Sequence, residues 1–482
     1  MTTRAAWIPL LLVTALTSGH FDQSRRLFIE HVVVVDVNAG RVLPDITVEI
    51  SDRTIAAMGH DLRVPTRGAT VVDGRGKYLI PGLWDMHVHL SFPEGAAKVF
   101  LPMMVANGVL GARDMHSFLP VILAIKRDVA SGAQIGPRLF VAGTAIDGPN
   151  SYLPGARIVH TPEEAKTAVR ELKVAGVDFI KVYSSLPRDL YLAVANEAKS
   201  EGIPFVGHVP YPVTAAEASD AGQRSLEHLT EVDVGTSSEE GAIKAEELAA
   251  MNEKHGYIPD PDRLRSTFDS AKANALFARF KRNDTWQVPT LTVFYEEREI
   301  AEPGLQAQDS LIAYMPELLR NYWRSLPVSI ATKMVALYGV HSDLVGRLNR
   351  VGVPLLAGSD SPNPFVYPGF GIHDELALLV RAGLTPAQAL RTATINPARF
   401  LGLSDSLGTV AVGKVADLVL LDGNPLTDIA NTKRIRAVVQ GGKLFNRDAL
   451  DAMLASAKAR AAENKALSVL RRTVHPENRP TT

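Results

Sequence analysis

The chain has 482 residues, of which 46% are hydrophobic, and its 51 lysines and arginines nearly balance its 52 aspartates and glutamates. This length and apolar content allow a large core with a smaller second module, and the balanced charge, without a basic block, argues against nucleic acid as a partner. The chain contains no cysteine, which excludes disulfides, thiolate metal ligands and a cysteine nucleophile.

The first 20 residues have the composition of a secretory signal peptide. Arg4 precedes an apolar run over residues 5–16, and small residues follow at 17–19. The run is shorter than the roughly 20 residues that a membrane-spanning helix needs. We therefore expect an exported protein, periplasmic or secreted, that loses residues 1–20 and has no membrane span in its mature chain. A buried N-terminal helix is the alternative.

Short apolar runs separated by turn residues then predict a small β-domain. They cover residues 32–37, 46–50, 55–59 and 70–73, and similar runs return at 408–410, 416–421 and 435–443. We expect residues 27–79 and 408–447 to pair into one β-sandwich built from both chain ends. Residues 448–482 should form a C-terminal helix, to about residue 468, and a tail.

Between residues 80 and 402, short apolar strands alternate with helical stretches, which favours a parallel α/β architecture. Strand candidates cover residues 83–89, 109–114, 138–142, 179–183, 205–208, 225–229, 288–293 and 354–360. Eight strands close a (β/α)8 barrel, so we predict a TIM-like barrel inserted into the β-sandwich. Residues 233–284 and 302–352 should be helical, capping the barrel mouth or decorating its surface. Thr385 and Pro386 mark the start of a later helix.

The clearest chemical signal is Asp85-Met86-His87-Val88-His89. Residues two apart in a strand point to the same side, so His87 and His89 can direct two imidazoles at one metal ion. The pair alone is weak, because 13 histidines give roughly a one-in-three chance of some His-x-His pair. Its weight comes from polar residues at or near the ends of later strand candidates, namely Lys181, His208, His228 and Asp360.

These residues and their order resemble the amidohydrolase superfamily, in its imidazolonepropionase-like and Xaa-Pro dipeptidase-like branch with a two-metal centre. The matching segments are Pro-Gly-Leu-Trp-Asp-Met-His-Val-His, Ile-Lys-Val-Tyr, Gly-His-Val-Pro, Glu-His-Leu, Gly-Ser-Asp and Thr-Ile-Asn-Pro-Ala. The resemblance implies that His87 and His89 bind one divalent metal ion and that His208 and His228 bind a second. It also implies that N6-carboxylated Lys181 bridges the two ions. Asp360 would be both a ligand and the general base for a metal-bridging hydroxide.

The carbamate that the resemblance implies has a chemical reason. A protonated lysine cannot bind a cation, and at an ordinary pKa of about 10.4 only about one lysine in 2,500 is neutral at pH 7. Reaction with carbon dioxide gives Lys181 a negative charge and two oxygens, whereas an ordinary surface ion pair is the alternative. With imidazole and oxygen ligands and no sulfur, we expect zinc, although manganese, cobalt or iron suit the same ligands.

Tyr183, Tyr211, His116 and His373 are candidates for substrate contact at the barrel mouth. Packing or structural roles are the alternatives for each. Tyr211 matches a position that helps bind the substrate carboxylate in dipeptidase-like relatives. The Gly-Gly-His motif that accompanies it there is replaced here by residues 143–152, which puts dipeptide specificity in question. For Arg113 and Asp114 we expect a buried ion pair that shapes the barrel.

These observations predict an exported, metal-dependent hydrolase of a small-molecule amide, such as an N-acyl amino acid, a dipeptide or a cyclic amide. A homo-oligomer is compatible with the sequence. Two alternatives stay open. The same site suits an ester, lactone or phosphotriester, because fold and metals do not fix the bond. A barrel that binds a ligand without turnover is the second, although all six predicted ligand positions are filled.

Overall fold

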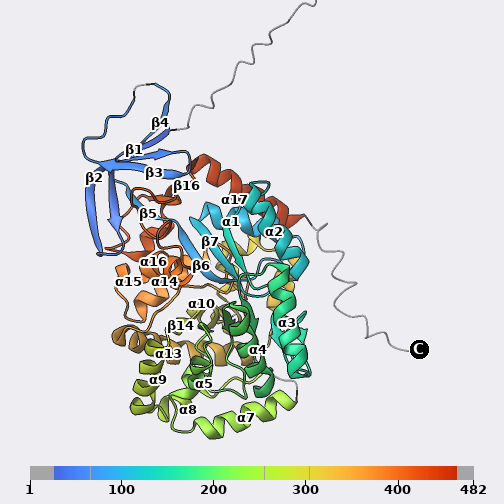
Figure 1. Cartoon of the computed structure of the whole chain (residues 1–482). Coiled ribbons are helices and arrows are strands. Elements are labelled where there is room, and N and C mark those ends of the chain that lie inside the picture. Colours follow the sequence, from blue (N-terminus) through green and yellow to red (C-terminus); the bar gives the residue numbers. More distant parts are fainter. Residues whose placement is uncertain (1–25, 66, 254–255, 303, 464–482) are drawn as a thin grey trace, which may run out of the picture.

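A computed structural model describes residues 26–65, 67–253, 256–302 and 304–463 (Figure 1). The predicted signal peptide over residues 1–20 lies outside these ranges, as does the end of the predicted C-terminal helix and tail. Among the described helices, none combines the length and apolar character needed to cross a bilayer.

One eight-stranded sheet takes strands from both ends of the chain. Its strands are β1 (Arg26–Asp36), β2 (Arg41–Ser51), β3 (Thr54–Gly59), β4 (Ala69–Asp73), β5 (Tyr78–Pro81), β15 (Leu418–Leu421), β16 (Ile435–Gln440) and β17 (Lys443–Asn446). Their order is β17-β16-β15-β5-β1-β2-β3, with β4 beside β1. The antiparallel pair β5 and β15 joins the two ends, so the strands that we expected in a sandwich belong to one hydrogen-bonded sheet. Residues 408–410 are not a strand, because Gly408 has a φ of 89°.

The two faces of β15 belong to different cores. Leu418 and Leu420 pack into a cluster confined to this sheet, whereas Val419 and Leu421 belong to the main core of the molecule. Successive side chains of a strand point to opposite faces, so β15 helps to anchor the sheet to the α/β part of the chain.

The α/β part contains two parallel sheets. One is formed by β6 (Leu83–Val88), β7 (Val109–Asp114) and β8 (Arg138–Val141). The other has the order β10-β9-β11-β12-β13-β14, formed by β9 (Ile146–Asp147), β10 (Arg157–Ile158), β11 (Ile180–Val182), β12 (Phe205–Gly207), β13 (Ser225–Glu227) and β14 (Trp286–Val288). Parallel bridges from Gln287 to Leu355 and from Val88 to Ser361 connect the sheets. The predicted α/β class with parallel strands is confirmed.

Two strand predictions in this part need correction. Residues 354–360 form no regular strand, since Pro354 has no N–H to donate and Asp360 takes a left-handed φ of 58°. In residues 288–293, β14 ends at Val288 and helix α10 (Leu291–Glu296) begins after Thr290, whose φ is 45°. An apolar run of this length does not distinguish a long strand from a short strand followed by a helix.

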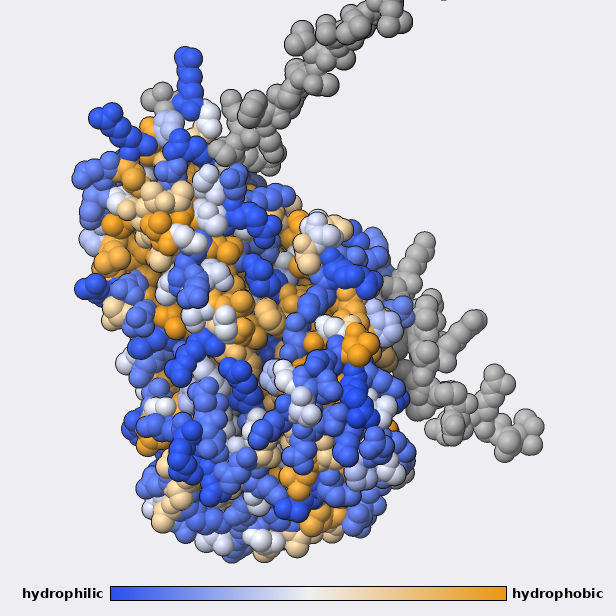
Figure 2. All heavy atoms as spheres, viewed as in Figure 1, coloured by the Kyte–Doolittle hydropathy of each residue, from blue (hydrophilic) through white to orange (hydrophobic). Residues whose placement is uncertain are grey.

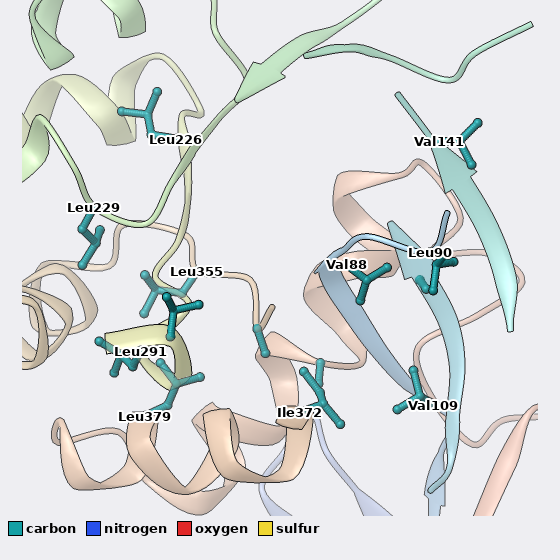
Figure 3. Packing of buried hydrophobic residues seen from close by; sticks show 14 of the residues in the cluster. Val88, Leu90, Val109, Val141, Leu226, Leu229, Leu291, Leu355, Ile372 and Leu379 are labelled. Carbon is teal, nitrogen blue, oxygen red and sulfur yellow. The ribbon is translucent and has the colours of Figure 1, made fainter. Parts of the chain in front are cut away.

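Helices cover the sheets (Figure 1). The helices between and after the strands are α1 (Ala97–Ala106), α2 (Leu119–Ser131), α3 (Pro162–Ala175), α4 (Arg188–Glu201), α5 (Ala215–Asp220), α14 (Gly371–Arg381), α15 (Pro386–Thr392), α16 (Ile395–Phe400) and α17 (Arg447–Ala462). Ile372 and Leu379 of α14 point into the buried cluster with Leu291 and Leu355 (Figure 3). Thr385 caps α15 as predicted, in a complete capping box with Pro386 as its first residue.

The two long connections are helical, as predicted. The first contains α6 (Val232–Gly235), α7 (Glu240–Asn252), α8 (Pro261–Ser266) and α9 (Ser270–Arg282). The second, which follows α11 (Arg298–Ala301), contains the 3-10 helices η1 (Gln306–Gln308) and η2 (Ser310–Tyr314), α12 (Glu317–Arg324) and α13 (Val328–Val351). The face in Figure 2 is largely hydrophilic over the lower helices, around α7 and α8.

Candidate metal centre

A cavity of about 600 Å³ lies over the C-terminal ends of the parallel strands. Its lining includes five of the six predicted metal ligands, namely His89, Lys181, His208, His228 and Asp360. The sixth, His87, is fully buried. Parallel strands present their C-terminal ends at one edge, so side chains far apart in sequence meet there.

His87, His89 and Asp360 form the tightest part of the group. One potential ligand atom from each lies within 4.8 Å of the other two. The Nε2 atoms of His87 and His89 lie 3.4 and 3.0 Å from Asp360 Oδ1. The left-handed backbone of Asp360 is held by its N–H, which donates to the carbonyl of His87 at 2.7 Å. Strain of this kind persists where the surroundings fix it, often at functional sites.

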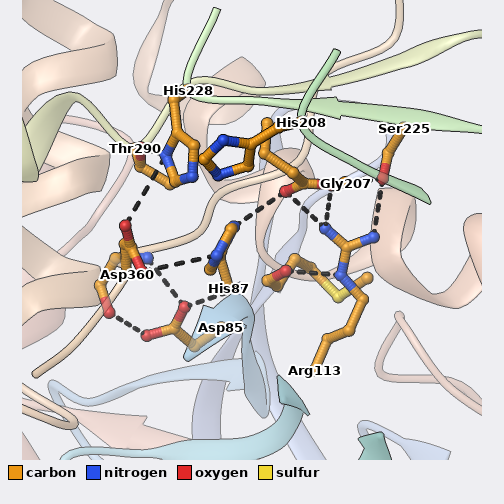
Figure 4. A network of polar contacts seen from close by, with 12 residues as sticks. Asp85, His87, Arg113, Gly207, His208, Ser225, His228, Thr290 and Asp360 are labelled. Atoms are coloured by element: carbon orange, nitrogen blue, oxygen red, sulfur yellow. Dashed lines mark hydrogen bonds and ion pairs between the residues drawn. The ribbon is translucent and has the colours of Figure 1, made fainter. Parts of the chain in front are cut away.

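His208 and His228 follow the neighbouring strands β12 and β13. Their ring centroids are 4.7 Å apart, and the rings of His87 and His228 are also 4.7 Å apart. Figure 4 shows His87, His228 and Asp360 pointing toward one another. Lys181, which is 1% exposed, lies on β11, where it pairs with Val206 of β12. All six predicted ligands therefore surround one space.

Each of the four histidines uses Nδ1 to contact a protein oxygen. The distances are 2.9 Å from His87 to Glu227 Oε2, 2.9 Å from His89 to the carbonyl of His116, 2.8 Å from His208 to Ser184 Oγ, and 2.7 Å from His228 to Thr290 Oγ1. The carboxylate and the carbonyl can only accept, so His87 and His89 carry a proton on Nδ1 when neutral and keep the Nε2 lone pair free. This is how metal-binding histidines are usually oriented.

Two facing atoms in this group accept or donate no hydrogen bond within the described part of the chain. They are His87 Nε2 and Asp360 Oδ1, both buried. A buried polar atom without a partner costs about 1–3 kcal/mol, so the pair calls for an occupant. Imidazole nitrogens beside carboxylate oxygens are the donors that zinc and related divalent ions prefer. The residues therefore fit divalent metal ions.

Burial sets the charge of these side chains. Loss of hydration lowers the pKa of His87 well below 6.5 and that of His228 to about 4, which leaves both imidazoles neutral and able to donate a lone pair. Burial would raise the pKa of Asp360, but the close contact with His89 and nearby positive charge outweigh burial and lower the pKa. Burial also lowers the pKa of Lys181 to about 8, which enlarges its share of the neutral amine that reacts with carbon dioxide.

Glu227 and Arg113 support His87 from the side opposite the cavity. The Glu227 carboxylate accepts from His87 Nδ1 at 2.9 Å, Arg113 Nη2 at 2.8 Å and Ser225 Oγ at 2.5 Å. The predicted Arg113–Asp114 ion pair is wrong, because adjacent strand residues point to opposite faces. Asp114 instead accepts from the N–H of Leu90 and from Ser117 Oγ. Sequence reasoning missed the role of Glu227, although it stands beside His228 in the Glu-His-Leu segment.

Asp85 was also missed, although it opens the motif that contains both histidines. Its carboxylate accepts from the Ser359 N–H at 2.8 Å and from Ser359 Oγ at 2.5 Å. These bonds hold the residue that precedes Asp360. The segment from Asp85 to His89 thus contains two of the predicted ligands and fixes the turn that presents a third, Asp360.

Three of the four predicted substrate contacts line the cavity, namely Tyr183, Tyr211 and His116. The Tyr183 ring lies 4.2 Å from the ring of His208, centroid to centroid. His116 has no free nitrogen, because Nδ1 accepts from the Ala145 N–H at 3.1 Å and Nε2 lies 3.1 Å from the Pro154 carbonyl. It therefore positions the loop around Pro154 rather than offering a nitrogen to a ligand.

His373 is not brought to the cavity. It is 2% exposed on the buried face of α14, where its nitrogens lie 3.0 Å from Thr432 Oγ1 and 3.0 Å from the carbonyl of Asn107. Our prediction of a substrate contact for His373 is corrected accordingly. Its sequence position after the last strand candidate did not reveal that the helix turns this side chain inward.

Comparison with known proteins gives consistent matches over most of the chain. A model described as the Amidohydrolase family matches residues 78–445. Ochratoxinase of Aspergillus niger is 22% identical over 472 residues, covering 84% of each chain. Imidazolonepropionase of Anaeromyxobacter dehalogenans (strain 2CP-1) is 28% identical over 401 residues, covering 79% of this chain and 84% of that one. A solved Xaa-Pro dipeptidase with bound methionine in the active site has a TM-score of 0.64 and 20% identity, covering 87% of this chain and 100% of that one. The resemblance to the imidazolonepropionase-like and Xaa-Pro dipeptidase-like branch is confirmed.

Proposed function

Because the chain belongs to the amidohydrolase family and is a hydrolase of carbon–nitrogen bonds, we propose that it hydrolyses the amide bond of a small molecule with two divalent metal ions, zinc in the first instance. The observation that carries the proposal is the facing pair of buried, partnerless atoms, His87 Nε2 and Asp360 Oδ1, among six convergent side chains. That arrangement costs free energy without cations and is explained by them.

The ligands divide between two positions. His87, His89 and Asp360 would hold one ion, and His208 and His228 would hold the other. Lys181, carboxylated on Nζ, would help to hold both ions. When bound, such ions make water acidic near neutral pH and polarise a substrate carbonyl.

Asp360 is the proton acceptor of the proposed reaction. Its carboxyl lies between the histidines, with Oδ1 3.0 Å from His89 Nε2 and Oδ2 3.7 Å from His228 Nδ1. The lowered pKa keeps the group ionised at neutral pH, as a general base must be. Asp360 takes a proton from the attacking water and passes it to the leaving amine. Tyr183 and Tyr211 face the same space and orient the substrate.

Two broader features belong to the same proposal. The two parallel sheets, joined by residues 355–361, close into a TIM-like barrel with the cavity at its mouth. The protein is exported, which rests on the composition of residues 1–20. N-terminal sequencing of the mature protein tests export, and a protein isolated with residues 1–20 still attached would contradict it.

The proposed reaction is tested by turnover of matched amides and esters before and after chelation. We expect amide hydrolysis, a loss of at least about 100-fold on removal of the metal, and recovery with added zinc. Full amide turnover by metal-free protein would overturn the proposal. Turnover of esters alone would move the assignment to the ester, lactone and phosphotriester group.

A further inference from the structure

The cavity has a second group of buried charged side chains, which the metal centre does not use. Glu231, Asp233 and Glu247 all line the cavity and are only 3%, 3% and 1% exposed. Glu231 and Asp233 follow strand β13, just beyond His228, and Glu247 lies on α7. We call these three residues the acidic wall.

The acidic wall is only partly neutralised by its protein neighbours. Lys244 forms an ion pair with Glu231, lies 3.2 Å from Glu247 Oε2, and also donates to the carbonyl of Tyr211 at 3.0 Å. His341 Nε2 lies 2.9 Å from Asp233 Oδ2. Three carboxyl groups therefore share one ammonium and one imidazole.

One carboxylate oxygen of the wall has only an ion-pair contact with the shared Lys244. Glu247 Oε2 is buried and accepts no well-formed hydrogen bond within the described ranges, although Lys244 is near. Because Glu247 lines the cavity, a group that enters the cavity can reach this side chain. A buried carboxylate gains most from a partner that brings both positive charge and N–H donors.

The rest of the lining offers little to a negative group. In the described part of the chain, the cavity is lined by no arginine and by no lysine other than the proposed metal ligand Lys181. A substrate carboxylate is usually held by a cationic fork, most often arginine. An acidic substrate would thus lack a partner and would also face the acidic wall.

Aromatic side chains lie beside the acidic wall. The Phe294 ring is 4.4 Å from that of His341, the partner of Asp233. Tyr257 donates its N–H to Tyr211 Oη at 3.0 Å, and Tyr152 Oη lies 3.3 Å from the same atom. Rings next to carboxylates suit an organic cation, which is attracted by the faces of the rings as well as by the opposite charge.

We infer that the acidic wall binds a primary ammonium or guanidinium group on the amide substrate, away from the bond that is cut. This inference rests on the proposed function and deepens it, since it names a basic amide as the substrate class and disfavours an N-acyl amino acid. Water adds across the C–N bond, so the carbonyl carbon gains the oxygen and leaves as a carboxylate, while the nitrogen gains a proton and leaves as an amine.

Three amides that differ only at their far end test the inference with the metal-loaded wild-type enzyme. They are N-benzoyl-1,4-diaminobutane, which is cationic, N-pentylbenzamide, which is neutral, and 5-benzamidopentanoate, which is anionic. We expect kcat/KM for the cationic amide to exceed that for the neutral one by roughly 10- to 100-fold, with the anionic amide slowest. Equal values for all three would overturn the inference and leave the proposed function intact.

Substitutions show which carboxylates produce the preference for the cationic amide. Glu247→Gln should abolish most of the preference for the cationic amide over the neutral amide. Glu253→Gln removes the same charge from an exposed position just after α7 and should leave both the preference and the turnover of the two amides unchanged. A preference that survives both Glu247→Gln and Glu231→Gln would show that the cation binds elsewhere and would overturn the inference.

Calorimetry gives a readout that does not depend on turnover. We expect 4-phenylbutylamine to bind the wild-type protein about tenfold more tightly than 4-phenylbutanol, with the difference lost in Glu247→Gln. If no amide is hydrolysed, the proposed function fails, but this binding comparison still decides whether the acidic wall takes a cation. Equal binding of the amine and the alcohol would count against it.

Discussion

Two pairs of histidines differ in what their ring nitrogens touch. His87 and His89 each use Nδ1 for a protein acceptor and direct Nε2 at Asp360 Oδ1. His116 and His373 have both nitrogens occupied by backbone or hydroxyl groups. Burial lowers the pKa of His87, His116 and His373 alike, so neutrality does not separate His87 from the other two. A histidine is ready to bind a metal when one nitrogen is held and the other is left free.

The largest loss of activity should come from replacing Asp360, the carboxylate that His87 and His89 face. Asp360→Asn removes the proton acceptor while keeping a side chain of the same size, so we expect kcat/KM to fall by roughly 100- to 10,000-fold with much of the metal retained. Asp374→Asn, on α14 in an ion pair with Lys433, is the matched control and should stay close to wild type. Activity of Asp360→Asn within threefold of wild type would remove Asp360 from the chemistry.

A smaller effect, on metal affinity, is expected from replacing Glu227, whose carboxylate accepts from Nδ1 of His87. Glu227→Gln leaves Arg113 without its anionic partner and weakens the orientation of the imidazole, so metal affinity should fall by about 10- to 100-fold. Competition with a chelator measures this change. Glu49→Gln loses an ion pair with Arg26 in the distant sheet and should keep wild-type affinity. Unchanged affinity in Glu227→Gln would mean that His87 needs no support from this carboxylate.

Replacing His373, a member of the second pair, should have little effect on catalysis. His373→Gln alters a side chain that does not line the cavity, so we expect kcat/KM to remain within about twofold of wild type. His89→Gln, the same substitution at a predicted ligand, should abolish most of the activity. Similar losses in both variants would erase the distinction between the two pairs.

The smallest signal is in the pH dependence of stability. Burial lowers the pKa of His373 to about 4 in the folded protein, against 6.5 when unfolded. Between these values the unfolded chain binds a proton that the folded chain does not, so the free energy of unfolding decreases as the pH falls. The share of His373 reaches about 3 kcal/mol near pH 4. Tm should therefore drop less between pH 7 and pH 4.5 in His373→Gln than in the wild type, and equal drops would contradict this origin.

The convergence of the six predicted metal ligands could be expected from sequence, because each lies at or near the end of a short apolar run. His87 lies near the end of β6, His89 directly follows that strand, and Lys181 lies on β11. Parallel strands bring such ends together without any knowledge of side-chain packing. The N-cap of α15 could also be predicted, because Thr385 and its capping partner Gln388 are only three residues apart. Patterns that depend on neighbours in sequence were therefore sufficient for these features.

The supporting contacts depend on residues that are far apart in the chain. Arg113 and Glu227 meet across 114 positions, so the local sequence gave Arg113 the wrong partner. Residues 354–360 were expected to be a regular strand, but Asp360 turns into a left-handed conformation to face the histidines. The acidic wall likewise requires α7 to fold over the end of β13, which no short motif reports.

Metal stoichiometry tests the central account most directly. We expect elemental analysis of the purified protein, equilibrated with zinc and freed of excess metal, to give about two ions per chain, and Lys181→Met, which removes the bridging group, to hold one or fewer. His373→Gln, which changes a histidine outside the cavity, should bind as many metal ions per chain as the wild type. A wild-type chain without bound metal, or a Lys181→Met chain that still holds two ions, would contradict the six-residue, two-metal site.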